Sequence, residues 1–125
     1  MATRKKPTKT ALKTLREQMQ EERAELVEQI AELDASADVA QWRDAGFDDD
    51  AADSGSAAFE RERAQSLAAH ARSIIRQIDD AFERMEAGTY GICGRCGEPI
   101  EQARLEAIPY STLCLDDKRR EEMGR

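Results

Sequence analysis

The three cysteines of this 125-residue chain lie in two short segments. Cys93 and Cys96 form a C-x-x-C pair in a glycine-rich turn, and Cys114 follows after seventeen intervening residues. Asp117 stands three residues further on, where a second C-x-x-C pair would end. Two such pairs at this separation are typical of a tetrahedral zinc site. The sequence therefore predicts a small zinc-binding lobe in which the fourth ligand is a carboxylate.

Asp117 leaves several interpretations open. A carboxylate can bind zinc but is a harder donor than a thiolate, so we expect weaker binding than at a four-cysteine site. Asp116 is an alternative ligand, and a zinc-free knuckle held by packing is a further outcome. Three protein ligands with an open position would suit a catalytic zinc, but no general base or cleft is indicated nearby. Unrelated or redox cysteines are less favoured, because no β-α-β pattern surrounds Cys93 and Cys96.

Composition and charge exclude some classes of protein. Charged residues make up 36% of the chain and aromatic residues 5%, which favours long exposed helices over a large core. The net charge is −7, and eight acidic residues against one basic residue lie between Glu32 and Asp53. Without a clustered basic face, nucleic acid is not expected as the main partner. The cysteine usage, with no secretory signal or membrane-length apolar run, predicts a cytoplasmic protein with no membrane partner.

The first half of the chain predicts one long helix. Residues 1–9 are polar and basic, and we expect them to be disordered. A helical apolar pattern then runs from residue 10 to about Ala45, with an irregularity expected near 34–36. The apolar positions are Leu12, Leu15, Met19, Leu26, Ile30 and Leu33, and Val39 and Trp42 are expected to extend the same face.

The acidic segment 46–55 is bracketed by glycines and predicts a turn. Ser56 is the expected cap of a second long helix, which ends at Gly88. Two long helices with a short connection predict an antiparallel hairpin over residues 10–88. His70 is expected to be solvated or packed rather than a ligand. The apolar stripe of the second helix is Phe59, Ala64, Leu67, Ala71, Ile74, Ile75, Ile78, Phe82 and Met85.

Residues 89–125 complete the predicted organisation as the zinc-binding lobe. Within it we expect a turn or short strand over 101–107 and a short final helix over 118–123. The predicted fold class is mainly α: a long antiparallel helical hairpin, or coiled coil, with a small C-terminal zinc-finger-like lobe and a short final helix. We expect a monomer.

The aspartates of segment 46–55 have two interpretations. Aspartate commonly caps turns and helix starts, and taken alone the pattern favours this role. The alternative is that the hairpin presents a cluster of carboxylates at its end. Such a cluster could approach a bound Mg²⁺ or dock on basic side chains of a partner.

The cysteine segment resembles the finger of the DksA/TraR family of bacterial transcription factors. The resemblance rests on residues 90–100 (YGICGRCGEPI), on 103–109 (ARLEAIP) and on Leu113-Cys114. The upstream hairpin fits the same family, so the resemblance covers nearly the whole chain from about Leu12. The finger pattern is specific, whereas the hairpin alone would be weak support.

The resemblance implies a regulator that binds RNA polymerase and does not bind DNA directly. Family members insert the hairpin into the secondary channel of the polymerase and alter initiation, often together with ppGpp. Their tip has an Asp-x-x-Asp-x-Ala pattern about forty residues before the first finger cysteine. In this chain Asp50 and Asp53 match its two aspartates, and Gly55 stands in place of the alanine. The resemblance therefore favours Asp50 and Asp53 as tip residues over simple caps.

Other positions depart from the family pattern. Asp117 replaces the fourth finger cysteine. Where family members offer basic contacts to ppGpp, helix 2 here has His70 and Gln77, although Lys118 is retained. A response to ppGpp is therefore not expected.

The leading hypothesis is a polymerase-binding regulator and not an enzyme. The alternative is a zinc-knuckle adaptor whose helices bind another protein. A metal-dependent hydrolase built on the three cysteines is a minor third option.

Overall fold

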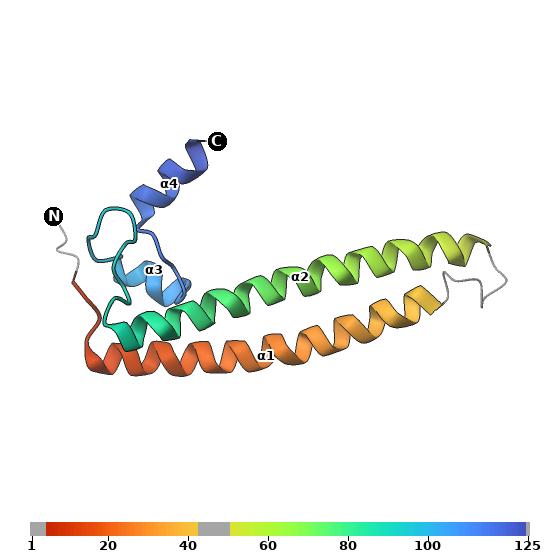
Figure 1. Ribbon diagram of the computed structural model, residues 1–125, viewed down its shortest axis with the longest axis horizontal. Helices are drawn as coiled ribbons and strands as arrows, with labels where there is room; N and C mark the ends of the chain where they lie inside the picture. The colour runs from red at the N-terminus through yellow and green to blue at the C-terminus, as the bar shows by residue number, and fades with distance from the viewer. Residues whose placement is uncertain (1–4, 43–50, 125) are drawn as a thin grey trace. The chain divides into compact units, whose positions relative to one another are not determined.

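The computed structural model describes residues 5–42 and 51–124, without the side chains of 51–54. These residues form the helices α1 (Lys9–Trp42), α2 (Ala51–Ala87), α3 (Gln102–Ala107) and α4 (Leu115–Met123) (Figure 1). The predicted mainly helical fold with a pair of long helices is confirmed. None of the described helices is long and apolar enough to cross a membrane.

The chain divides into two compact units. The hairpin unit is Arg23–Arg76, and the finger unit combines Met1–Glu22 with Gln77–Arg125. Both long helices contribute residues to both units.

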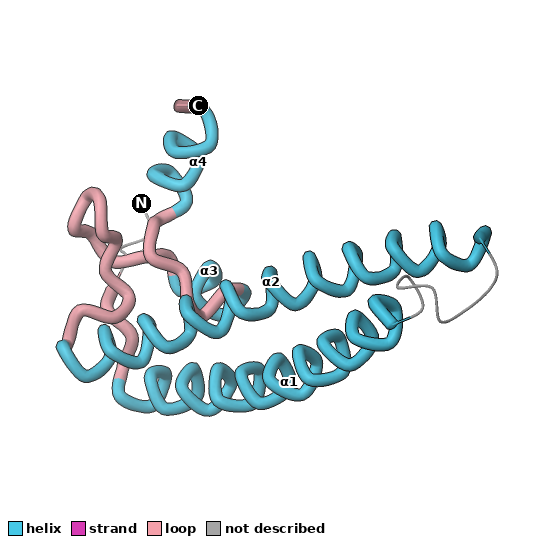
Figure 2. The backbone as a smooth tube through the Cα atoms, turned by 45° about the vertical axis from the view of Figure 1, so that its right-hand side comes forward, coloured by secondary structure: helices cyan, strands magenta, loops and turns pink. Residues whose placement is uncertain are grey.

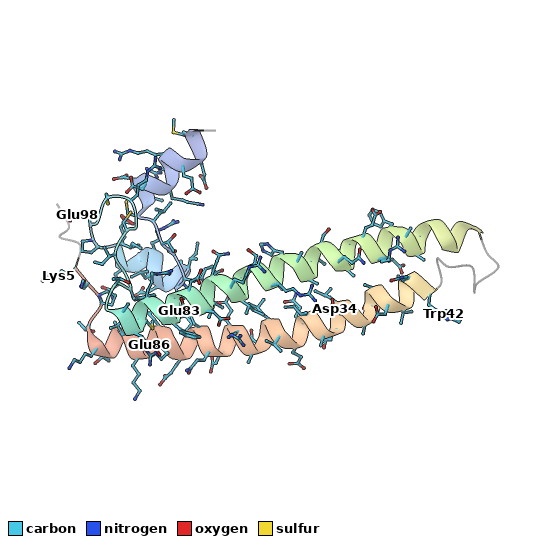
Figure 3. The ribbon with its side chains drawn as sticks, in the orientation of Figure 1. Lys5, Asp34, Trp42, Glu83, Glu86 and Glu98 are labelled. Carbon is cyan, nitrogen blue, oxygen red and sulfur yellow. The ribbon has the colours of Figure 1, made fainter. Side chains whose placement is uncertain are left out.

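Small side chains form the core of the hairpin unit, where α1 and α2 lie side by side and run in opposite directions (Figure 1). Alanine allows two helices to approach closely, since the distance between packed helices depends on the side chains at the contact. An ion pair between Arg72 Nη2 and Asp34 Oδ2, at 2.6 Å, joins the two helices at their half-exposed edge (Figure 3). Such surface ion pairs contribute at most about 1 kcal/mol to the free energy of unfolding, so helix packing is the main source of stability in this unit. The buried residues are Ala37, Ala40, Ala57, Ala64, Ala68 and Ala71.

The apolar faces were only partly predicted. The six apolar positions expected from Leu12 to Leu33 are all buried or half-buried. In the described part of α1 beyond Leu33, the buried residues are Ala37 and Ala40, which continue the helical spacing of the buried face. Val39 and Trp42, which were expected to extend this face, are 60% and 56% exposed. In α2, Phe59 and Leu67 were also wrongly placed in the core and are 68% and 44% exposed. The predicted Ala64 and Ala71 are buried, but the prediction otherwise followed large apolar residues, whereas close helix packing selects alanine.

Several predicted boundaries differ from the structure. α1 is continuous through 34–36, where an irregularity was expected, and its described part ends at Trp42. α2 begins at Ala51, so residues 51–55 are helical and Ser56 is not its cap. Alanine is the best helix former, and four alanines in 51–58 offset the cost of Gly55, which is about 1 kcal/mol relative to alanine. Residues 43–50 lie outside the described residues.

The C-terminal part is more helical than expected. α3 replaces the turn or short strand expected over 101–107, and the final helix α4 begins at Leu115 rather than at residue 118. Figure 2 shows these two short helices joined by the loops of the finger unit. An isolated antiparallel bridge joins Ile92 and Pro99 in the first of these loops. The core of this unit includes Leu15, Met19, Ile78, Ala81, Tyr90, Ile100, Leu105 and Pro109.

The N-terminal segment makes specific contacts within the finger unit. Thr8 caps α1, because its Oγ1 accepts the backbone N–H of Ala11 at 3.1 Å. Lys6 Nζ donates to the carbonyl of Gly88 at 3.3 Å. Gly91 has φ +82°, and a Cβ there would lie 2.9 Å from Cδ of Pro7. The sequence predicted that residues 1–9 are disordered, but Lys6 and Pro7 contact the start of the finger and Thr8 caps α1.

Candidate metal centre

A tight turn brings Cys93 and Cys96 together. Cys93 N–H donates to the carbonyl of Glu98 at 2.8 Å, and Gly97 N–H donates to the carbonyl of Cys93 at 3.0 Å. Gly97 has φ +75°, a conformation that favours glycine. This glycine requirement explains why the pair sits in a glycine-rich segment.

The start of α4 supplies the other two side chains. Cys114 is the N-cap of the helix and Asp117 is its third residue, and Lys118 N–H donates to the carbonyl of Cys114 at 2.9 Å. Residues three apart on a helix lie on one face, so this turn points both side chains the same way. A bond from Gly94 N–H to the carbonyl of Thr112, at 2.8 Å, ties the two segments together.

The four predicted side chains converge on one point. The donor atoms of the Cys₃Asp cluster, defined as Cys93, Cys96, Cys114 and Asp117, all lie within 4.8 Å of one another. Asp117 Oδ2 lies 3.1 Å from Cys93 Sγ and 3.3 Å from Cys114 Sγ, and the sulfurs of Cys96 and Cys114 are 3.9 Å apart. His70 is exposed on α2 and does not belong to this cluster.

These distances fit a tetrahedral zinc ion. Ligands at the usual zinc–sulfur distance of about 2.3 Å and zinc–oxygen distance of about 2.1 Å would place sulfurs about 3.8 Å apart and sulfur and oxygen about 3.6 Å apart. The observed separations depart from these values by less than about 0.6 Å. The donor set of three sulfurs and one carboxylate oxygen is also of the kind that binds zinc.

Asp117, and not Asp116, faces the sulfurs. Asp117 is 2% exposed, whereas Asp116 is exposed to solvent. The helix register explains this difference, because residue 117, three after the N-cap, returns to the side of Cys114, whereas residue 116 does not. The alternative ligand considered from the sequence therefore lies outside the cluster.

The electrostatics of the cluster couple the thiols to the carboxylate. Hydrogen bonds donated by the thiols of Cys93, Cys96 and Cys114 lower the pKa of Asp117 to about 2. For Cys96, a backbone N–H at Glu98 favours the thiolate, but the Asp117 carboxylate, burial and the neighbouring sulfurs together raise its pKa to about 12. The Cys96 thiol therefore holds its proton tightly, and metal binding there has to release it.

Two further residues support the cluster and were not predicted. Arg104 on α3 donates its Nε to the carbonyl of Leu113 at 2.9 Å, which fixes the backbone just before Cys114. Glu101 Oε2 accepts the N–H of Leu115 at 3.1 Å, at the start of α4. Both residues lie well before Cys114 in the sequence, and no sequence pattern indicated that they would contact the segment around it.

The structure does not test the predicted tip residues. Asp50 lies outside the described residues. Asp53 lies in the first turn of α2, and its side chain is not described.

The comparisons with known proteins agree on one family. The family model described as "Prokaryotic dksA/traR C4-type zinc finger" matches residues 88–122. The solved structure of transcription factor DksA2 from Pseudomonas aeruginosa is 30% identical, with a TM-score of 0.75, and the match covers 93% of this chain and 86% of that one. This chain belongs to the DksA/TraR family. An uncharacterized protein of Aquifex aeolicus is 33% identical over 85% of this chain and 72% of its own length.

Two named curated relatives are matched over shorter stretches. The RNA polymerase-binding transcription factor DksA of Caulobacter vibrioides is 47% identical over 51 residues, which are 41% of this chain and 36% of that protein. General stress protein 16O of Bacillus subtilis is matched over 44% of its length. The chain thus spans less than half the length of these two relatives. Family membership and the Cys₃Asp cluster together indicate Zn²⁺ as the cofactor.

Proposed function

We propose that this protein regulates transcription by binding RNA polymerase directly. The observation that carries the proposal is the likeness to DksA2, which extends over both units and not only the finger. A relative with 47% identity in its matched segment is named for polymerase binding. The proposed action takes place in the cytoplasm and involves no catalysis and no direct recognition of DNA.

In this proposal the hairpin enters the secondary channel of the polymerase. Asp50 and Asp53 would act near the active site, where carboxylates can approach a bound Mg²⁺ or pair with basic side chains. Support comes from the sequence, in which the two aspartates match the family tip pattern. A requirement for ppGpp is not part of the proposal, because His70 and Gln77 replace basic residues of the family.

We further propose Cys93, Cys96, Cys114 and Asp117 as the ligands of a structural zinc. The ion would join the first loop of the finger to the start of α4 and so fix the small lobe. A lobe of this size has little core of its own, so a metal crosslink contributes much of its stability.

The test is promoter-dependent transcription with polymerase from the organism that encodes the chain. The variant D50N/D53N removes two tip charges, and D48N/D49N is its matched control with the same change in net charge. We expect wild type and the control to alter transcript yield, and D50N/D53N to bind polymerase without altering it. Equal activity of both double variants would contradict the proposed role of Asp50 and Asp53.

The adaptor hypothesis is the second candidate, and one observation favours it. Val39, Trp42, Phe59 and Leu67 expose apolar side chains on the hairpin unit, where another protein's helices could bind. An adaptor that acts through these faces would keep its function in D50N/D53N and lose it when Val39 and Phe59 are changed to serine. The polymerase proposal expects the tip variant to be the inactive one.

A further inference from the structure

The carboxylate of Asp117 uses its two oxygens differently. Oδ2 faces the sulfurs of Cys93 and Cys114, at 3.1 and 3.3 Å. Oδ1 accepts a hydrogen bond from Nη1 of Arg120 at 3.2 Å. The Asp117 side chain is 3% exposed and that of Arg120 is 73% exposed. Arg120 therefore lies on the solvent side of a buried carboxylate and engages the oxygen that turns away from the sulfurs.

This division has a chemical consequence for a metal ligand. A carboxylate can bind a cation through either oxygen or through both, whereas a cysteine offers a single sulfur. A partner that holds one oxygen leaves a defined donor for the metal, as outer hydrogen bonds commonly do for metal ligands. The guanidinium also offsets part of the charge of the site, since three thiolates and a carboxylate carry more negative charge than Zn²⁺ neutralises.

We propose that Arg120 is a positioning residue of the metal centre. By holding Oδ1, it directs Oδ2 toward the three sulfurs and allows an aspartate to occupy the place of a fourth cysteine. The inference rests on the proposed zinc ligands and not on polymerase binding, so a failure to bind polymerase leaves it unaffected.

The neighbouring basic residues do not share this role. Lys118 Nζ pairs with Glu121 at 3.2 Å. Arg119 is exposed, and its side chain makes no hydrogen bond or ion pair with the described part of the chain. Helix spacing explains the difference, because residue 120 is three positions after Asp117 and lies on its face. Arg119→Gln is therefore a matched control for Arg120→Gln, with the same change in charge one residue away.

The first measurement is the zinc affinity of the full chain, determined by competition with a chromophoric chelator. We expect Arg120→Gln to bind zinc about 10-fold to 100-fold more weakly, the range typical of outer-shell partners, and Arg119→Gln to stay within about twofold of wild type. The visible absorption of the Co²⁺-loaded protein should change in Arg120→Gln alone, because it reports the ligand geometry. Equal affinities and equal spectra for the two variants would overturn the proposal.

The second measurement separates positioning from a general charge effect. In an Asp117→Cys background the fourth ligand is a single sulfur with no second oxygen to hold. We expect Arg120→Gln to change zinc affinity there by less than about twofold, against about tenfold or more in the native background. An equal loss in both backgrounds would overturn positioning, whether its cause is charge or damage to the fold. Far-UV circular dichroism of the metal-free variants identifies which of these causes applies.

Discussion

A single buried carboxylate distinguishes this metal centre from a site of four cysteines. Asp117 is 2% exposed and lies in the first turn of α4, three residues after the N-cap Cys114, so its place follows from the helix register. A carboxylate oxygen is a harder donor than a thiolate sulfur and suits zinc less well. The residue therefore predicts a measurable weakness of zinc binding.

Restoring the fourth cysteine should strengthen the site. We expect Asp117→Cys to tighten zinc binding by at least about tenfold, or about 1.4 kcal/mol, in chelator competition. Asp116→Cys is the control, because residue 116 is exposed and faces away from the cluster. A similar gain from Asp116→Cys would show that the ligand position is not specific to residue 117.

Tyr90 is a second residue whose chemistry can be tested. Its hydroxyl donates to the buried carbonyl of Pro109 at 2.6 Å. We expect Tyr90→Phe to lower the free energy of unfolding by about 1–2 kcal/mol, because that carbonyl loses its partner. Tyr110→Phe, at a half-buried position, should change it by less than about 0.5 kcal/mol. Chemical denaturation followed by circular dichroism provides the comparison.

The same tyrosine predicts a pH dependence. Burial raises the pKa of Tyr90 from 10.0 to about 12, with a smaller opposing effect of Arg84. The folded state then holds the phenol proton more tightly than the unfolded state. This contribution is full below pH 10 and is lost as the pH rises through about 12. Between these values wild type should lose more stability than Tyr90→Phe, and equal losses would contradict the assignment.

At the scale of elements, the hairpin unit depends on alanine. The two helices approach each other over Ala37 and Ala40 on one side and four alanines of α2 on the other. Large apolar residues instead lie outside this contact, as Val39 and Phe59 do. The space available between the two helices, and not the number of large apolar residues, therefore determines which face of each helix is buried.

Enlarging one seam alanine should destabilise the hairpin. Ala68 is fully buried, whereas the next residue, Ala69, is exposed on the same helix. We expect Ala68→Leu to cost about 1–3 kcal/mol through overpacking. Ala69→Leu should stay within about 0.5 kcal/mol of wild type. Thermal unfolding followed at 222 nm compares them, and equal midpoints would argue against a close alanine contact.

For the whole molecule, the sequence predicted what depends on spacing along the chain. The cysteine separation predicted the cluster, and the helical spacing of apolar residues predicted both long helices. Spacing gave only part of the alanine contact: Ala64 and Ala71 were predicted, but Ala37, Ala40, Ala57 and Ala68 were not, because alanine is weakly apolar and common on exposed faces as well. The spacing of residues also did not predict the roles of Arg104 and Glu101, because their contacts depend on how α3 packs against the start of α4. The aspartates of the tip stay a prediction, since Asp50 lies outside the described residues.

The most direct test of the central proposal is the affinity of the labelled protein for core RNA polymerase from its own organism. The account predicts saturable binding that unlabelled protein competes away and that weakens as salt screens the acidic hairpin. It also predicts that D50N/D53N competes for the same site. Absence of saturable binding, with the protein folded and zinc-loaded, would contradict the account. The family likeness would then describe the fold alone, and the adaptor hypothesis would take its place.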